Sequence, residues 1–370
     1  MASSFIKGYI VVSLIAALLG CDYKYSNHEI PALPAANTLN YIKSIRVLDE
    51  AIRRDPQDAA NYHKRALLLY KSNSPGSLQS ILKAIELDQN HAQYYFLAAQ
   101  ILLAQQQIQN ALDHALRAEI LGYRFPDLYR LLAELNYHSG YYGKGLLYVN
   151  RALALNPSES HNYYLKGLMF IAIGDTLEGE KYIRQSLDQQ ESRRAFNAMV
   201  DIYSYRKQFD SAFYFLNRNL SQDPQDPALL YKRAILLKET GNLDSAVASF
   251  KALVNSYDPK YQLYNQISFI KYTNNQWDSA DYYAIKTLSV NNEDKEALLI
   301  LARTQNRRGN YSQSIVNYTT LLEVDSTVLM AQEELEKLKR KVAYLRDLQK
   351  QMLERPKIEI LVPKKVVKEK

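Results

Sequence analysis

The side chains best suited to chemistry in this sequence are one cysteine and six histidines. Cys21 has no second cysteine to pair with, so neither an internal disulfide nor a thiolate metal cluster can form. No two histidines have the i, i+4 spacing that places two metal ligands on one helix face: they are His28, His63, His91, His114, His138 and His161. Metalloprotease, serine-hydrolase and phosphate-loop motifs are absent as well. We therefore predict no catalytic residues, no metal and no cofactor.

The residues before Cys21 predict an export signal over residues 1–20. Lys7 supplies a positive charge, and an apolar run follows it from Gly8 to Gly20. This run is shorter than the roughly 20 residues that a membrane-spanning helix needs. The sequence Leu18-Leu19-Gly20-Cys21 resembles the lipobox of bacterial lipoproteins.

That resemblance implies cleavage before Cys21, acylation of its thiol and a lipid anchor in a membrane of the bacterial cell envelope. Inner and outer membrane both remain open. The alternative is an ordinary secretory leader with a chance cysteine. Residues 21–39 contain two prolines and show no helical periodicity, so we expect a tether there.

The net charge of +7 is concentrated at the C-terminus. Residues 355–370 hold six basic and two acidic side chains, a net of +4. The remaining excess is small and spread over the long middle of the chain, so no basic stripe is available to follow a phosphate backbone. We predict no nucleic-acid binding, and a basic tail over residues 356–370 that could touch anionic lipid.

Small residues recur every 33 or 34 positions in two phased series. Packed antiparallel helices need small side chains where their axes approach most closely, so the series predict one helix crossing per repeat. The first series is Ser44, Ser77, Ala111, Gly145, Gly179, Ala212, Ala246, Ala280 and Ser314. The second is Ala66, Ala99, Ala133, Gly167, Val200, Ala234, Ser268 and Ala302.

Turn residues separate the two series. Glycines that can end a helix lie between them at 140, 174, 241 and 309, and prolines at 56, 157, 224 and 259 follow the second helix. With Tyr163, Gly167, Gly174 and Gly179 in one unit, the pattern resembles the tetratricopeptide repeat (TPR). This resemblance implies an all-α, right-handed superhelical solenoid of about eight helix-turn-helix repeats over residues 40–326, the first preceded by a single helix.

A different period begins near residue 327. Apolar residues at spacings of three and four predict one long C-terminal helix over residues 327–355. Such a helix can cap the last apolar face of a solenoid. Its heptads could also form a coiled coil, which would make a homo-oligomer.

The TPR resemblance also implies a binding surface, because ligands of that family usually lie along the concave side formed by the first helix of each repeat. Among these positions are six tyrosines that we expect to be exposed, since they occupy none of the family's structural positions. The predicted partner-binding residues are Tyr70, Phe96, Arg130, Tyr137, Tyr164, Asn197, Tyr205, Tyr231, Lys238, Asn265, Tyr272 and Arg303.

The resulting hypothesis is a membrane-anchored scaffold that binds a partner peptide or helix in the concave groove. The alternative is a structural subunit joined to an assembly through the C-terminal helix or by self-association. A third function, carbohydrate or peptidoglycan binding by the tyrosines, ranks last.

Overall fold

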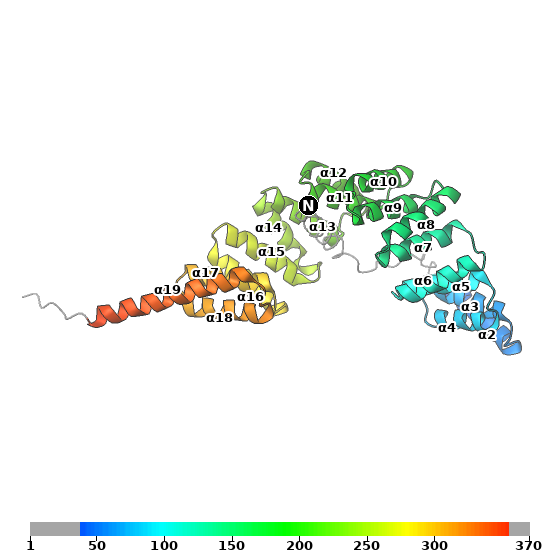
Figure 1. Cartoon of the computed structure of the whole chain (residues 1–370), viewed down its shortest axis with the longest axis horizontal. Helices are drawn as coiled ribbons and strands as arrows, with labels where there is room; N and C mark the ends of the chain where they lie inside the picture. The colour runs from blue at the N-terminus through cyan, green and yellow to red at the C-terminus, as the bar shows by residue number, and fades with distance from the viewer. Residues whose placement is uncertain (1–37, 355–370) are drawn as a thin grey trace, which may run out of the picture. The chain divides into compact units, whose positions relative to one another are not determined.

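The computed structural model describes residues 38–354, and within that range it is all-α with no strand (Figure 1). A leading helix, α2 (Thr38–Arg54), precedes eight antiparallel helix pairs. A long helix, α19 (Leu329–Glu354), follows them. This confirms the predicted all-α repeat solenoid.

The described residues form two compact units. Unit 1 ends at Gln222 and unit 2 begins at Asp223. The pairs of unit 1 are α3 (Ala59–Lys71) with α4 (Ser77–Leu87), α5 (Ala92–Ala104) with α6 (Ile108–Ile120), α7 (Pro126–His138) with α8 (Tyr142–Leu155), α9 (Ser160–Ala172) with α10 (Thr176–Gln189), and α11 (Arg193–Tyr205) with α12 (Phe209–Gln222). Those of unit 2 are α13 (Pro227–Glu239) with α14 (Leu243–Ala252) and the short 3₁₀ helix η2 (Leu253–Asn255), α15 (Lys260–Thr273) with α16 (Trp277–Val290), and α17 (Lys295–Arg307) with α18 (Tyr311–Val324).

The two series of small residues mark the helix crossings. All their members are buried except Ser44 in the leading helix. A Cβ atom on Gly167 would lie 2.5 Å from Ile183 Cγ1 and 2.9 Å from the carbonyl oxygen of Gly179, so α9 and α10 cross with almost no room between their backbones. Serine is accepted at other crossings because its hydroxyl donates to the facing helix, as Ser268 does to the Ala280 carbonyl at 2.8 Å.

All eight turns inside the pairs contain a residue with positive φ. In four of them, the residue that ends the first helix in this left-handed conformation is a glycine. In the other four this conformation is held, with φ between 50° and 62°, by Asn73, Gln106, Lys207 and Asn275. After α5, the Gln107 amide donates to Leu102 and the Gln106 amide to Leu103, which is a Schellman ending. The helix-ending geometry is therefore kept where the glycine signal is lost.

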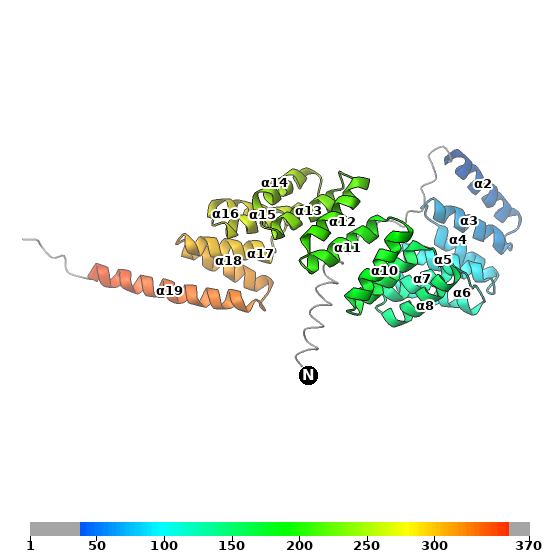
Figure 2. The same ribbon diagram turned by 90° about the horizontal axis from the view of Figure 1, so that it is seen from above.

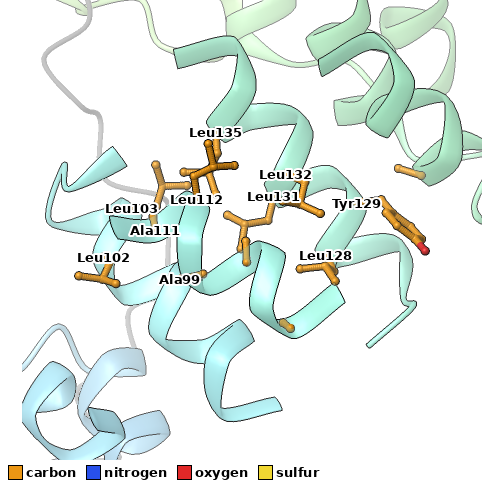
Figure 3. Close-up of a cluster of buried hydrophobic side chains, with 13 residues drawn as sticks. Ala99, Leu102, Leu103, Ala111, Leu112, Leu128, Tyr129, Leu131, Leu132 and Leu135 are labelled. Atoms are coloured by element: carbon orange, nitrogen blue, oxygen red, sulfur yellow. The ribbon is translucent and has the colours of Figure 1, made fainter. Parts of the chain in front are cut away.

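Leucine and alanine side chains fill the space between successive repeats. Figure 3 shows one such cluster, where Leu102 and Leu103 of α5, Leu112 of α6, and Leu132 and Leu135 of α7 come together. All five are at least nine-tenths buried. Each pair thus covers the apolar side of the next, which is why repeats of this kind are stable only when stacked.

The last repeat is covered by the first half of α19. Ala331, Leu335 and Leu338 are buried against Leu298 of α17 and Leu321 of α18. The capping role that the apolar spacing predicted therefore applies to this half of the helix. The second half extends past the last repeat in both views (Figure 1, Figure 2).

Candidate protein-binding face

The first helices of successive repeats contact one another directly, in unit 1 through α3, α5, α7 and α9 and in unit 2 through α15 and α17. Successive second helices approach each other less closely. The first helices therefore lie on the inner side of each stack. We call the side chains that they present there the first-helix face of unit 1 or of unit 2.

In unit 1, this face brings together predicted residues from repeats that are not adjacent. Tyr70 of the first repeat lies close enough to Arg130 and Glu134 of the third repeat to respond to their charges. Burial raises the pKa of Tyr70, the Glu134 carboxylate raises it further, and the Arg130 guanidinium lowers it. Arg130 is half-buried and has an ion pair with Asp127 of its own helix at 3.4 Å.

Phe96 begins a row of aromatic rings that the sequence did not reveal. Its ring stacks on Tyr123 at 4.8 Å between centroids, and Tyr123 contacts Phe125 at 4.7 Å. Tyr123 and Phe125 belong to the segment between α6 and α7, outside the helical periodicity used for the prediction. Phe125 is 56% exposed, so the row ends in an apolar surface open to solvent. The two aromatic residues just before Pro126 were the only feature of the sequence that could have indicated this row.

The remaining predicted residues of unit 1 differ in exposure. Burial raises the pKa of Tyr137 to about 12, and its ring lies 5.8 Å from that of Tyr142. Tyr164 is half-buried, with its ring 5.9 Å from His161. Asn197 accepts a hydrogen bond from the buried Asn219 of α12 at 3.2 Å. Tyr205 is 43% exposed.

In unit 2, the predicted residues are bound mainly to one another and to their neighbours. Tyr231 stacks on Tyr257 at 4.6 Å. Lys238 donates to Gln266 at 2.9 Å and lies 5.7 Å from the centre of the Phe269 ring. The Asn265 amide is buried and donates to Glu296 at 2.8 Å and to Asp294 at 3.3 Å.

The last two predicted residues lie in α15 and α17. Tyr272 contacts Trp277 edge to face at 5.5 Å. Arg303 donates twice to Glu334 of α19, at 2.7 and 3.0 Å, and the Tyr318 hydroxyl donates to the same carboxylate at 2.6 Å. Burial alone would raise the pKa of Glu334, but the hydrogen bonds from Arg303 and Tyr318 hold it below its usual value. Arg303 thus holds α19 against the last repeat through these hydrogen bonds.

These contacts correct one expectation from the sequence. Tyr70, Tyr137, Tyr231 and Tyr272 pack against buried hydrophobic clusters, so the expectation that they have no structural role is wrong. Each position accommodates an aromatic ring because neighbouring repeats leave space between their first helices. Of the six tyrosines, only Tyr205 is among the exposed large side chains.

Several predictions fall outside the described residues: the signal peptide, Cys21, most of the tether and the basic tail. Over residues 38–354, no group of three histidine, cysteine, aspartate or glutamate side chains could hold a metal ion. In the same range, none of the helices combines the length and the apolar character needed to cross a membrane.

No family model matches the chain. It is 25% identical over 213 residues to the human protein O-mannosyl-transferase TMTC1, a match that covers 55% of this chain and 23% of that protein. It is also 25% identical over 124 residues to a TPR repeat-containing protein of Methanocaldococcus jannaschii, covering 33% of this chain and 22% of that one. The chain therefore spans less than a quarter of the curated relatives that it matches.

Among solved structures, the C-terminal part of a TPR repeat-containing protein from Cytophaga hutchinsonii is similar in fold, with a TM-score of 0.53 and 16% identity. The match covers 65% of this chain and 99% of that one. The chain thus has the fold of a TPR solenoid.

Proposed function

We propose that this chain is a protein-interaction scaffold, held at a membrane of the bacterial envelope by lipid on Cys21. The partner is an extended peptide or a helix that lies across the first-helix face of unit 1. The TPR fold supports the general role. The choice of unit 1 is supported by the difference between the two faces.

The aromatic row of Phe96, Tyr123 and Phe125 is the observation that carries this proposal. Stacked rings are large, rigid and apolar, and they need little further ordering when a partner binds. Phe125 at the end of the row is more than half exposed, whereas Tyr70 of α3 and Arg130 of α7 are half-buried. An aromatic anchor beside polar groups is the usual composition of a binding hot spot.

Site-specific crosslinking tests this proposal. A photoreactive phenylalanine analogue replaces Phe125 in the full-length chain, expressed in the organism from which it comes. Tyr214 of α12 is the matched control, because it is an equally exposed aromatic on a second helix, at 56%. We expect one discrete protein adduct from position 125 and none from position 214. Equal labelling from both positions, or none from position 125, would contradict a site on the first-helix face.

The lipid anchor is tested separately. Cells grown with an alkyne-bearing fatty acid should incorporate the label into the wild-type chain, and the chain should sediment with membranes. Cys21→Ser should remove both the label and the sedimentation, because no other thiol is present. A Cys21→Ser chain that still carries the label would refute this anchor, whatever the crosslinking experiment shows.

A further inference from the structure

The two halves of α19 differ in their surroundings. Its first half is buried against the last repeat, as described above, and has ion pairs such as Lys339 with Glu336 at 3.0 Å. In its second half, Tyr344 is 66% exposed, Leu345 37% and Met352 63%. The second half therefore has an apolar surface that no other described part of the chain covers.

This surface forms a stripe along one side of the helix. With about 100° of turn per residue, Leu345, Leu348 and Met352 fall within an arc of about 60°. Arg346, Asp347 and Lys350 lie on the other side of the helix, each about 130° or more from the centre of the stripe. Neither Arg340 nor Arg346 has an ion pair with another described residue. The second half is thus amphipathic, with an apolar side and an opposite, charged side that holds more cations than anions.

A second copy of the chain fits this stripe poorly. Continuing the heptad of Leu338, Val342 and Leu345 places Gln349 in the core of a two-stranded coil. In a parallel pair, Lys341 of one helix would face Arg346 of the other, so like charges would meet along the seam. The free segment is also short for a coiled coil in water.

An anionic lipid surface fits better. From Arg340 to Met352 the helix has four basic residues and one acidic residue, a net charge of +3. The sequence that follows, residues 353–370, adds a net +3. Amphipathic helices with lysine and arginine on the polar face lie in the head-group region of membranes, where each cation near an anionic surface adds to the affinity.

We propose that the second half of α19 binds the surface of an anionic bilayer, with Leu345, Leu348 and Met352 facing the lipid. This contact is separate from the proposed partner site on unit 1 and does not depend on it. It would give the chain a second attachment to the membrane besides the proposed lipid on Cys21.

Two labelled full-length chains test the proposal. Both have Cys21→Ser, which removes the native thiol and its acylation. One has Met352→Cys in the stripe. The other has Ala343→Cys, which is exposed and lies on the opposite side of the helix, about 180° away. Each new thiol is labelled with an environment-sensitive fluorophore. The chains are mixed with vesicles of pure phosphatidylcholine, or of equal parts phosphatidylcholine and phosphatidylglycerol.

We expect a blue shift at position 352 with the phosphatidylglycerol vesicles only, and none at position 343. Adding Arg346→Gln and Lys350→Gln should weaken binding of the labelled site by up to about fivefold for each charge removed, because both cations lie on the side away from the stripe. Four results would overturn the proposal: no shift at position 352, equal shifts at both positions, an equal shift with uncharged vesicles, or a vesicle-independent shift that grows with protein concentration. The last result would show that a second copy covers the stripe.

Discussion

The first-helix faces of the two units are built from the same repeat but differ in chemistry. In unit 1, Phe96 of the face begins a row of stacked rings that ends at exposed Phe125, just before α7. Tyr70 and Arg130 of the same face are half-buried. In unit 2, Lys238 of α13 donates to a side chain of α15, and Arg303 of α17 donates to one of α19. A polar group that already has a good partner gains little from a ligand, because the first bond must be broken to make the second. Under the proposed function, this difference assigns recognition to unit 1 and cohesion to unit 2.

The helix crossings differ in a parallel way. Unit 1 contains the glycine pair Gly167 and Gly179, whereas unit 2 has alanine at the corresponding Ala234 and Ala246. Gly179→Val should have the largest effect of the changes considered, since a Cβ there would lie 2.5 Å from Ile171 Cγ1 and 3.0 Å from the Gly167 carbonyl oxygen. We expect unit 1 to lose about 3 kcal/mol or more of its free energy of unfolding.

The two units can be followed separately in this experiment. Trp277, the only tryptophan of the chain, lies in unit 2, so its fluorescence reports on that unit. Far-ultraviolet circular dichroism reports on both. In a urea titration of Gly179→Val, part of the dichroism should be lost early, with the Trp277 midpoint unchanged. A Trp277 midpoint that falls by the same amount would show that the units unfold as one.

Partner affinity should show the next largest effect. Phe96→Ala removes the inner ring of the aromatic row, and we expect about a tenfold loss or more, which is about 1.4 kcal/mol, in affinity for the protein crosslinked at position 125. Tyr231→Ala, the matched change in unit 2, should leave that affinity within about twofold, because its ring stacks on Tyr257 instead. Titration calorimetry with both variants measures this. Equal losses would remove the distinction between recognition and cohesion.

The sequence predicts the fold well because the small residues at the crossings reflect a local limit on volume. A small residue such as Gly167 or Ala234 is needed at every crossing, so small residues recur with the repeat even where the neighbouring side chains differ. Only the left-handed turns that contain glycine could be predicted from the sequence. Gln106 and Lys207 also have positive φ, although neither residue type favours that conformation. The TPR pattern also locates the first-helix face, although its use by a partner remains a prediction.

The pattern could not predict the partners of the face residues. Phe96 of α5 meets Tyr123 of the segment before α7, and Arg303 of α17 meets Glu334 of α19, so each contact joins residues far apart along the chain. Such contacts depend on the small rotation between successive repeats, which the repeat pattern of one sequence does not specify. For the same reason, aromatic residues expected at the surface, such as Tyr137, proved to fill space between helices.

A substitution of Glu334 should destabilise unit 2, with a smaller effect than Gly179→Val has on unit 1. Glu334→Gln replaces the carboxylate that accepts hydrogen bonds from Arg303 and Tyr318 with a neutral amide. We expect the free energy of unfolding to fall by about 1–2 kcal/mol at neutral pH. The folded-state pKa of Glu334 is lowered, so its contribution is present above the unfolded value of about 4.3 and is lost as pH falls through the folded value.

The wild-type advantage over Glu334→Gln should therefore disappear in acid. Urea unfolding followed by Trp277 fluorescence, at neutral pH and at about pH 3, measures it. Glu180→Gln is the matched change in unit 1, where Tyr203 and Arg206 donate to that carboxylate. It should lower the stability of unit 1 and leave the Trp277 midpoint unchanged. An advantage for wild-type Glu334 that persists in acid would show that its charge does not hold α19.

Tyr205→Ala should have the smallest effect, and it determines how far along unit 1 the partner extends. Tyr205 ends α11 and is 43% exposed, with no hydrogen bond to another described residue. Its removal should change the free energy of unfolding by less than about 0.5 kcal/mol. If the partner reaches the fifth repeat, affinity should fall by about threefold, as expected for a contact at the rim. Tyr214→Ala, on the second helix of the same repeat, should change neither quantity. An unchanged affinity for Tyr205→Ala would confine the partner to the first four repeats, where the aromatic row lies.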